Sequence, residues 1–80
     1  MPNQPEFDLL RQTCSTALEQ FILEARKSEL SMHQLSMPVS RTAARRFSSQ
    51  RTAEAAAYEN YLSTSIRLIE FILPPPDVIN

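Results

Sequence analysis

Cysteine, histidine and the carboxylates are the residues of this chain that could carry catalytic chemistry, and their spacing does not favour it. The chain has one cysteine, Cys14, and one histidine, His33, far apart in the sequence. A nucleophilic Cys–His pair needs both side chains within hydrogen-bond reach and a third group that orients the base. Cys14 instead lies between Leu10 and Leu18 in an apolar line at helical spacing, where a buried and unreactive thiol is the ordinary outcome. We therefore expect no catalytic residues and a protein that is not an enzyme.

A metal site is equally weakly supported. Glu29 and His33 would share one face of a helix at a separation of four residues, but a zinc site needs three or four ligands. No further cysteines, histidines or carboxylates cluster beside this pair. A single thiol cannot form an internal disulfide, and unpaired thiols are typical of reducing compartments. We expect no metal, no cofactor and a cytoplasmic location.

Charge is segregated along the chain, although it sums to −1. Residues 1–25 carry a net −3, residues 26–53 a net +5 and residues 54–80 a net −3. The central segment contains four arginines that could form a basic patch for an acidic partner: Arg41, Arg45, Arg46 and Arg51. Arg41 and Arg45 would share a helical face, where like charges repel slightly, and such an arrangement is typical of docking on carboxylates or phosphates. The alternative is that these arginines pair with the acidic ends of the chain or are simply solvated.

The same segment also permits a second class of function. LSMHQLSMPVSRTAARRF has the order of helix, short turn and arginine-rich helix that helix-turn-helix motifs share. Two features argue against DNA reading, because the turn has no glycine and Thr42 stands where a core aliphatic residue is expected. A small DNA-binding transcriptional regulator that uses the Arg41–Arg51 segment is therefore the alternative function.

Long helices are the elements expected to position these residues. The chain has no glycine, where average usage predicts roughly five or six, and glycine supplies the backbone conformations of hairpin turns and phosphate-binding loops. We therefore expect an all-α fold with Asn3 as the first helix cap and Pro38 in the main break. The expected elements are a helix at about 5–30, a loop at about 31–39, a long or bent helix at about 40–73 and a proline-rich tail at 74–80.

The second helix carries more apolar surface than one neighbouring helix can cover. Two stripes at helical spacing merge into an arc of roughly 220°, about twice the width that a surface helix needs. The residues expected to form an interface are Tyr58, Tyr61, Leu62, Ile66, Leu68, Ile69 and Phe71. The helices would form a helical hairpin that completes a bundle by dimerisation, or a three-helix arrangement if the chain is split at Ser48 and Ser49.

These features favour a small interaction module as the main function. The longest apolar stretch, from Ile66 to Leu73, contains Arg67 and Glu70 and is too short to span a bilayer, so no membrane association is expected. We expect a single helical domain, residues 1–80, that binds another protein, itself or both. Its role would be that of an adaptor, an inhibitor or a chaperone-like regulator.

Overall fold

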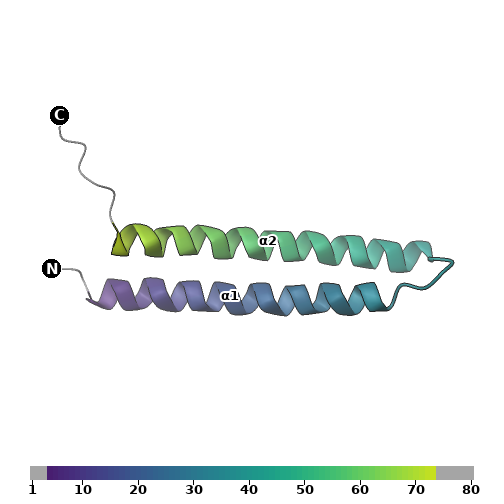
Figure 1. Cartoon of the computed structure of the whole chain (residues 1–80), viewed down its shortest axis with the longest axis horizontal. Helices are drawn as coiled ribbons and strands as arrows, with labels where there is room; N and C mark the ends of the chain where they lie inside the picture. Colours follow the sequence, from purple (N-terminus) through teal and green to yellow (C-terminus); the bar gives the residue numbers. More distant parts are fainter. Residues whose placement is uncertain (1–3, 74–80) are drawn as a thin grey trace, which may run out of the picture.

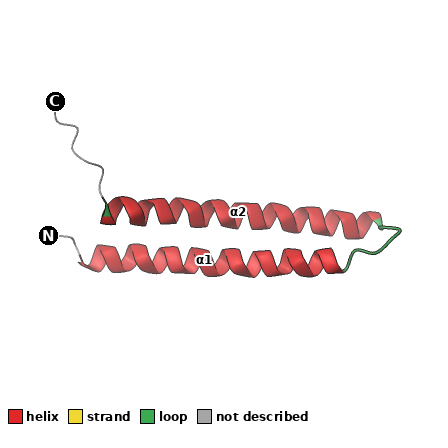
Figure 2. Ribbon diagram, viewed as in Figure 1, coloured by secondary structure: helices red, strands yellow, loops and turns green. Residues whose placement is uncertain are grey.

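The computed structural model describes residues 4–73, which form two antiparallel helices. The first helix, α1, is Gln4–His33, and the second, α2, is Arg41–Ile72. Figure 1 shows the helices side by side, with the connecting loop at one end and the start of α1 beside the end of α2 at the other. Figure 2 shows that no strand occurs within the described range. The predicted all-α fold is confirmed, and it takes the form of a helical hairpin rather than a three-helix arrangement.

The loop between the helices is shorter than the sequence suggested. α1 continues through Ser31 to His33, because the first residue whose backbone is restricted is Met37, which precedes Pro38. α2 also runs without interruption through Ser48 and Ser49, so that the expected split does not occur. The expected cap at Asn3 and the proline-rich tail at residues 74–80 lie outside the described residues.

Ser40 sets the start of α2. Its backbone is extended, with φ −72° and ψ 152°, and its Oγ accepts a hydrogen bond from the Ala43 backbone N–H at 3.0 Å. This bond satisfies one of the donors that the first turn of a helix leaves without an intrahelical partner. The chain can therefore leave the loop and enter the helix within a single residue.

The contact between the helices follows a seven-residue repeat in each of them, as in a coiled coil. In α1 the repeat includes Phe7, Cys14, Phe21 and Ser28. In α2 the residues that are less exposed than their neighbours are Ala43, Phe47, Gln50, Glu54, Ala57, Tyr61, Thr64, Ser65, Leu68 and Phe71. We call this contact the seam.

The seam encloses little apolar volume. Within residues 4–73, only Ala17, Ser28 and Thr64 are buried, and no large side chain is fully buried. Two helices can cover only one side of each other, and a chain of this size gains little stability from its core even when that core is enclosed on all sides. The hairpin therefore has a seam without a closed core.

Candidate functional site

The structure keeps the cysteine and the histidine apart. Cys14 is half-buried in the seam, where its Sγ lies 3.5 Å from Ser65 Oγ. His33 is exposed in the last turn of α1, about 28 Å further along the helix at 1.5 Å per residue. Residues 4–73 contain no group of three or more histidines, cysteines and carboxylates that could hold a metal ion. The described chain thus brings together neither a Cys–His pair nor a set of metal ligands.

The hairpin divides at its middle into two halves of different composition. The open half contains residues 4–21 and 58–73, and the loop half contains residues 22–57. In the open half the two helices carry two cations and five anions, a net charge of −3. In the loop half they carry six cations and three anions, a net charge of +3. Folding back on itself thus turns three charged segments of the sequence into two oppositely charged halves.

Aromatic rings hold the seam together from the open end to its middle. Phe7 and Phe71 stack with their ring centroids 6.2 Å apart. Phe21 lies 6.4 Å from the Tyr61 ring and 5.2 Å from the Tyr58 ring. Aromatic pairs of this kind contribute about 0.5–1.5 kcal/mol beyond the area they bury.

The seven residues expected to form an interface are thereby divided between two positions. Three of them, Tyr61, Leu68 and Phe71, are half-buried in the seam against α1. The other four are exposed on the outside of α2: Tyr58, Leu62, Ile66 and Ile69, with 45–54% of their surface accessible. We call these four residues the apolar flank.

The apolar flank is a continuous surface because its members follow one another at intervals of four, four and three residues along α2. It extends toward the open end through Ile72, which is also exposed. An isolated exposed leucine or isoleucine is common, but a contiguous row of large apolar side chains normally marks a binding surface. The width of the apolar arc in the sequence was the signal that predicted it.

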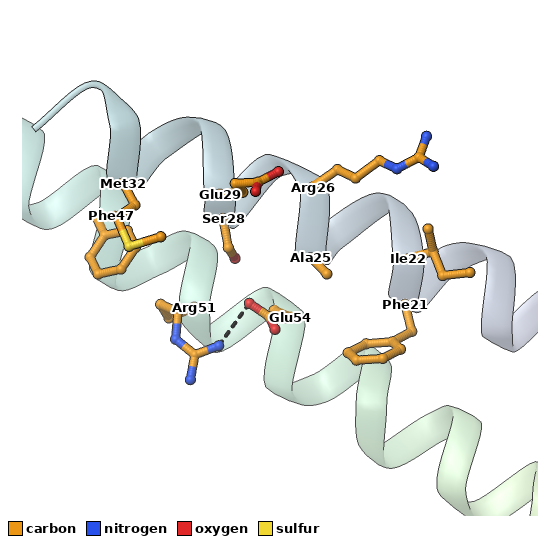
Figure 3. Close-up of a pocket in the computed structure, with 10 residues that line it drawn as sticks. All are labelled: Phe21, Ile22, Ala25, Arg26, Ser28, Glu29, Met32, Phe47, Arg51 and Glu54. Atoms are coloured by element: carbon orange, nitrogen blue, oxygen red, sulfur yellow. Dashed lines mark hydrogen bonds and ion pairs between the residues drawn. The ribbon is translucent and has the colours of Figure 1, made fainter.

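An open groove of about 560 Å³ lies between the helices in the loop half. Figure 3 shows the ten residues that line it. Its apolar lining consists of Phe21, Ile22, Ala25, Met32 and Phe47, and its charged lining consists of Arg26, Glu29, Arg51 and Glu54. Sequence reasoning did not predict this groove, because the residues come from both helices and Ile22, Met32 and Phe47 lie outside the stripes that periodicity singled out.

The groove and the apolar flank lie on the same broad face of the hairpin. Phe21 lines the groove and contacts Tyr58, the first residue of the flank. Arg51, which lines the groove, lies seven residues before Tyr58, and residues two helical turns apart leave a helix on the same side. One broad face of the hairpin therefore joins an apolar row in the open half to an apolar groove in the loop half.

The opposite broad face is mostly polar. The side chains that flank the seam there are Gln20 and Lys27 from α1 and Asn60 and Arg67 from α2, and all four are exposed. Helical spacing separates Asn60 from Tyr58 by about 200° around α2. The apolar flank and the groove thus lie together on one broad face, whereas the exposed leucines of α1, Leu9, Leu23 and Leu30, lie elsewhere on that helix.

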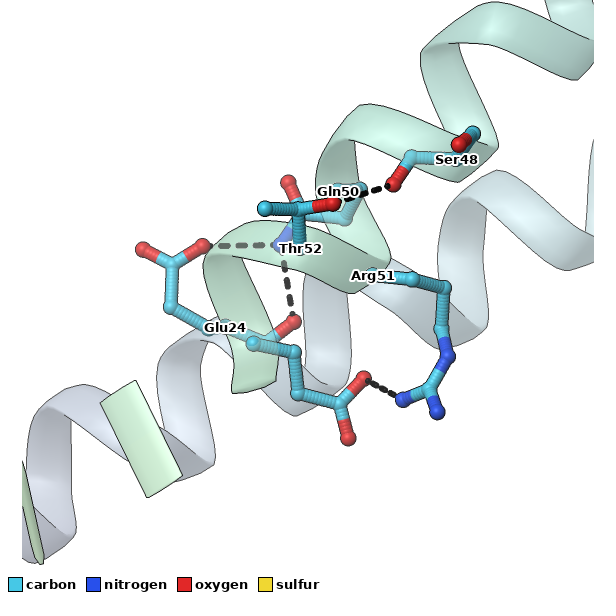
Figure 4. Close-up of polar contacts among 6 residues, drawn as sticks. Glu24, Ser48, Gln50, Arg51 and Thr52 are labelled. Atoms are coloured by element: carbon cyan, nitrogen blue, oxygen red, sulfur yellow. Dashed lines mark hydrogen bonds and ion pairs between the residues drawn. The ribbon is translucent and has the colours of Figure 1, made fainter. Parts of the chain in front are cut away.

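Within the loop half, Glu24 replaces an apolar seam residue. Gln50 Nε2 donates to the Glu24 side chain at 2.7 Å and to the Glu24 backbone carbonyl at 3.0 Å (Figure 4). Gln20 Nε2 donates to the other carboxylate oxygen at 2.9 Å, and Lys27 Nζ lies 3.6 Å from it. The hydrogen bond from Gln50 is the largest cause of a pKa of Glu24 below the ordinary value of 4.5, and Lys27 and Gln20 lower this pKa further, whereas burial opposes the shift.

Glu54 is also a charged residue at a seam position, four residues after Gln50 along α2. Arg51 Nη1 donates to its carboxylate at 2.7 Å (Figure 3). The buried Ser28 hydroxyl faces Glu54 across the seam without making a hydrogen bond of standard geometry. Interaction with Ser28 and then with Arg51 lowers the pKa of Glu54 below its ordinary value of 4.5.

The four arginines of the expected basic patch are all exposed in the loop half, on different sides of α2. Arg41 and Arg45 share a side because they are four residues apart. Arg46 leaves the helix about 100° away from Arg45, and Arg51 lies at the groove, bound to Glu54. What the four share is therefore the loop half and its positive charge, rather than a single face.

Comparison of the chain with known protein families, with curated proteins and with solved structures finds no match. Neither of the two described helices is long and apolar enough to cross a membrane. The site is therefore described by the chain's own residues: the apolar flank, the adjoining groove and the charge of the two halves.

Proposed function

We propose that the protein is a non-catalytic protein–protein interaction module that docks through the apolar flank and the groove. The observation that carries this proposal is the exposure of the flank after the hairpin has formed, because α1 covers the neighbouring seam residues and leaves this row in solvent. Burial of apolar surface stabilises a complex by about 25 cal/mol per Å². A partner that covers the flank would therefore gain affinity from apolar surface that the isolated hairpin leaves exposed.

Two further helices laid on the broad apolar face would complete a four-helix bundle. The flank and the groove would then form the inner layer between two helix pairs. The arginines of the loop half would orient the partner by attracting its acidic groups, an effect that acts on specificity and association rate more than on affinity. An adaptor, an inhibitor or a chaperone-like regulator could work in this way.

We propose a protein partner rather than DNA, and we propose a cytoplasmic location. An arginine-rich recognition helix needs several cations directed at one groove of the duplex, whereas Arg46 and Arg51 point to different sides of α2. The unpaired thiol of Cys14 fits a reducing compartment.

The test is a pull-down from a lysate of the native host, followed by mass spectrometry, with wild type and two double variants. Leu62→Ser with Ile69→Ser removes the apolar character of the flank. Leu23→Ser with Leu30→Ser is the matched control, because these leucines are equally exposed but lie on the side of α1 turned away from α2. We expect at least one protein to be captured by wild type and by the control and to be lost with the flank variant. Capture that is the same for all three chains would contradict the proposal.

A further inference from the structure

We propose that a second copy of this chain covers the apolar flank, packed broad face to broad face and reversed end for end. The open half of each hairpin then lies on the loop half of the other. This inference rests on the proposed function, since it uses the same flank and groove, and it adds the identity of the partner and its orientation. Three properties of the broad face lead to it: its size, its shape and its charge.

The size of the face matches what a stable dimer needs. Two helices of about 30 residues are about 45 Å long and together about 20 Å wide, which gives a face of about 900 Å². Specific protein complexes bury about 800 Å² on each partner. A second hairpin of the same dimensions covers the whole face without help from any other element.

The shape of the face is complementary to itself when one copy is reversed. A twofold axis that crosses the helices at the level of Tyr58 brings residue 69 of one copy to the level of residue 47 of the other, because each helix rises 1.5 Å per residue. Ile69 then reaches the end of the groove that Phe47 and Met32 line. By symmetry, both flanks and both grooves are covered. In the unreversed arrangement, groove would face groove and remain unfilled.

The charge of the face selects the same arrangement. Reversal sets the open half, with its net −3, against the loop half, with its net +3, at both ends of the dimer. The unreversed arrangement would set −3 on −3 and +3 on +3. Charges at this range are partly screened at physiological ionic strength, where the Debye length is about 8 Å, so the effect sets orientation and depends on salt.

A second copy also supplies the core that the hairpin lacks. The large apolar side chains of the broad face that are exposed in one hairpin would be enclosed between two: Ile22, Met32, Tyr58, Leu62, Ile66 and Ile69. Small chains without a disulfide or metal commonly reach stability through such oligomers. The dimer is thus a four-helix bundle made of two identical halves.

Sedimentation equilibrium of the full chain tests the identity of the partner. We expect a mass of twice 9.1 kDa for wild type and for Leu23→Ser with Leu30→Ser, and 9.1 kDa for Leu62→Ser with Ile69→Ser at the same concentration. A wild-type mass of 9.1 kDa at up to about 100 µM would overturn the inference. If the same flank variant nevertheless lost a captured protein, the proposed function would stand while the second copy failed as the partner. If the variant changed neither mass nor capture, both would fail.

Disulfide trapping tests the orientation. In a Cys14→Ser background, one chain carries Ile69→Cys and the other Ser48→Cys, an exposed position on α2 next to Phe47. Both chains must first sediment as dimers. On mixing and oxidation, the reversed dimer yields the mixed disulfide between positions 69 and 48. The unreversed dimer holds these positions about 30 Å apart, so formation of like-with-like disulfides alone would overturn the proposed orientation.

Discussion

In the open half of the hairpin the helices meet through stacked rings, whereas in the loop half the seam also includes an amide, two carboxylates and a buried hydroxyl. Phe7 on Phe71 represents the first kind of contact, and Gln50 on Glu24 represents the second. The outer surfaces differ too, since the open half carries the apolar flank and a net negative charge, and the loop half carries the groove and a net positive charge. Each half thus offers on its surface what the other half would bind.

The two kinds of contact contribute differently to the packing of α1 against α2. The apolar contacts stabilise this packing, and the polar contacts fix its register. Apolar seam residues attract many partners at many offsets, whereas a hydrogen-bonded polar residue in a seam favours one register. The pair of hydrogen bonds from Gln50 to Glu24 is formed only when α2 is placed against α1 at one offset. We infer that the open half supplies most of the stability of the hairpin and that the loop half fixes its alignment.

The largest effect is expected from a change that tests this division of stability. Phe21→Ala removes the ring that contacts Tyr58 and Tyr61 and should lower the free energy of unfolding by about 2–4 kcal/mol. Ser28→Ala, at the same position of the next seven-residue repeat, should change it by less than about 1 kcal/mol, because the buried hydroxyl makes no regular hydrogen bond. Urea unfolding followed by circular dichroism measures both. Equal losses would show that the two halves do not differ as described.

Charge reversal in the loop half should have the next largest effect, and it acts on association. Arg45→Glu with Arg46→Glu changes the net charge of the loop half from +3 to −1 and should weaken the dimer about tenfold at low salt. Adding Glu59→Lys and Glu70→Lys changes the open half from −3 to +1 and should restore part of the loss. Both effects should shrink in about 1 M salt. Sedimentation at two salt concentrations measures them, and a salt-independent weakening would point to disrupted packing instead.

Removal of the hydrogen bonds from Gln50 to Glu24 should have a smaller effect on stability. Gln50→Ala leaves the Glu24 carboxylate without its strongest interhelical donor and should cost about 1–2 kcal/mol of unfolding free energy. Thr52→Ala is the matched control, since the Thr52 hydroxyl bonds only within α2, to the Ser48 carbonyl (Figure 4). Its substitution should cost less than about 0.5 kcal/mol. Equal costs for the two variants would remove the special role of Gln50.

Acid should destabilise the hairpin through the loop half, with the smallest of these effects. The pKa values of Glu24 and Glu54 are lower in the folded state than the ordinary value of 4.5. Their contribution to stability is therefore fully present above about pH 4.5 and is lost as the pH falls through the lowered values. The thermal unfolding midpoint should fall over this acidic range, and less steeply in Glu24→Gln with Glu54→Gln. An unchanged slope in that variant would assign acid unfolding to other groups.

Periodicity predicted the helices and the excess of apolar surface, because both follow from residue spacing alone. The line through Phe7, Cys14 and Phe21 faces α2. Periodicity could not divide the apolar arc on α2 into seam and surface residues, because a helical-wheel projection does not show which side of α2 is covered by α1. Tyr61 and Leu68 thus belong to the seam and Leu62 to the surface.

The polar seam and the groove were beyond sequence reasoning for a different reason. Glu24, Gln50 and Glu54 lie at seam positions, but a rule that places apolar residues inside reads them as outward-facing. The seven-residue interval from Phe21 to Ser28 was the available signal, and it required polar members to be counted. The groove depends on residues from both helices, including Met32 of α1 and Phe47 of α2, an arrangement that neither helix encodes alone.

The most direct test of the central claim is the thermal unfolding midpoint of the wild-type chain measured between about 1 µM and about 100 µM. If two hairpins complete each other's core, association stabilises only the folded state, and the midpoint should rise steadily with concentration. The Leu62→Ser, Ile69→Ser variant should show no such rise. A wild-type midpoint that stays constant across this range would contradict the account, because it would mean that the hairpin is stable with its apolar flank uncovered.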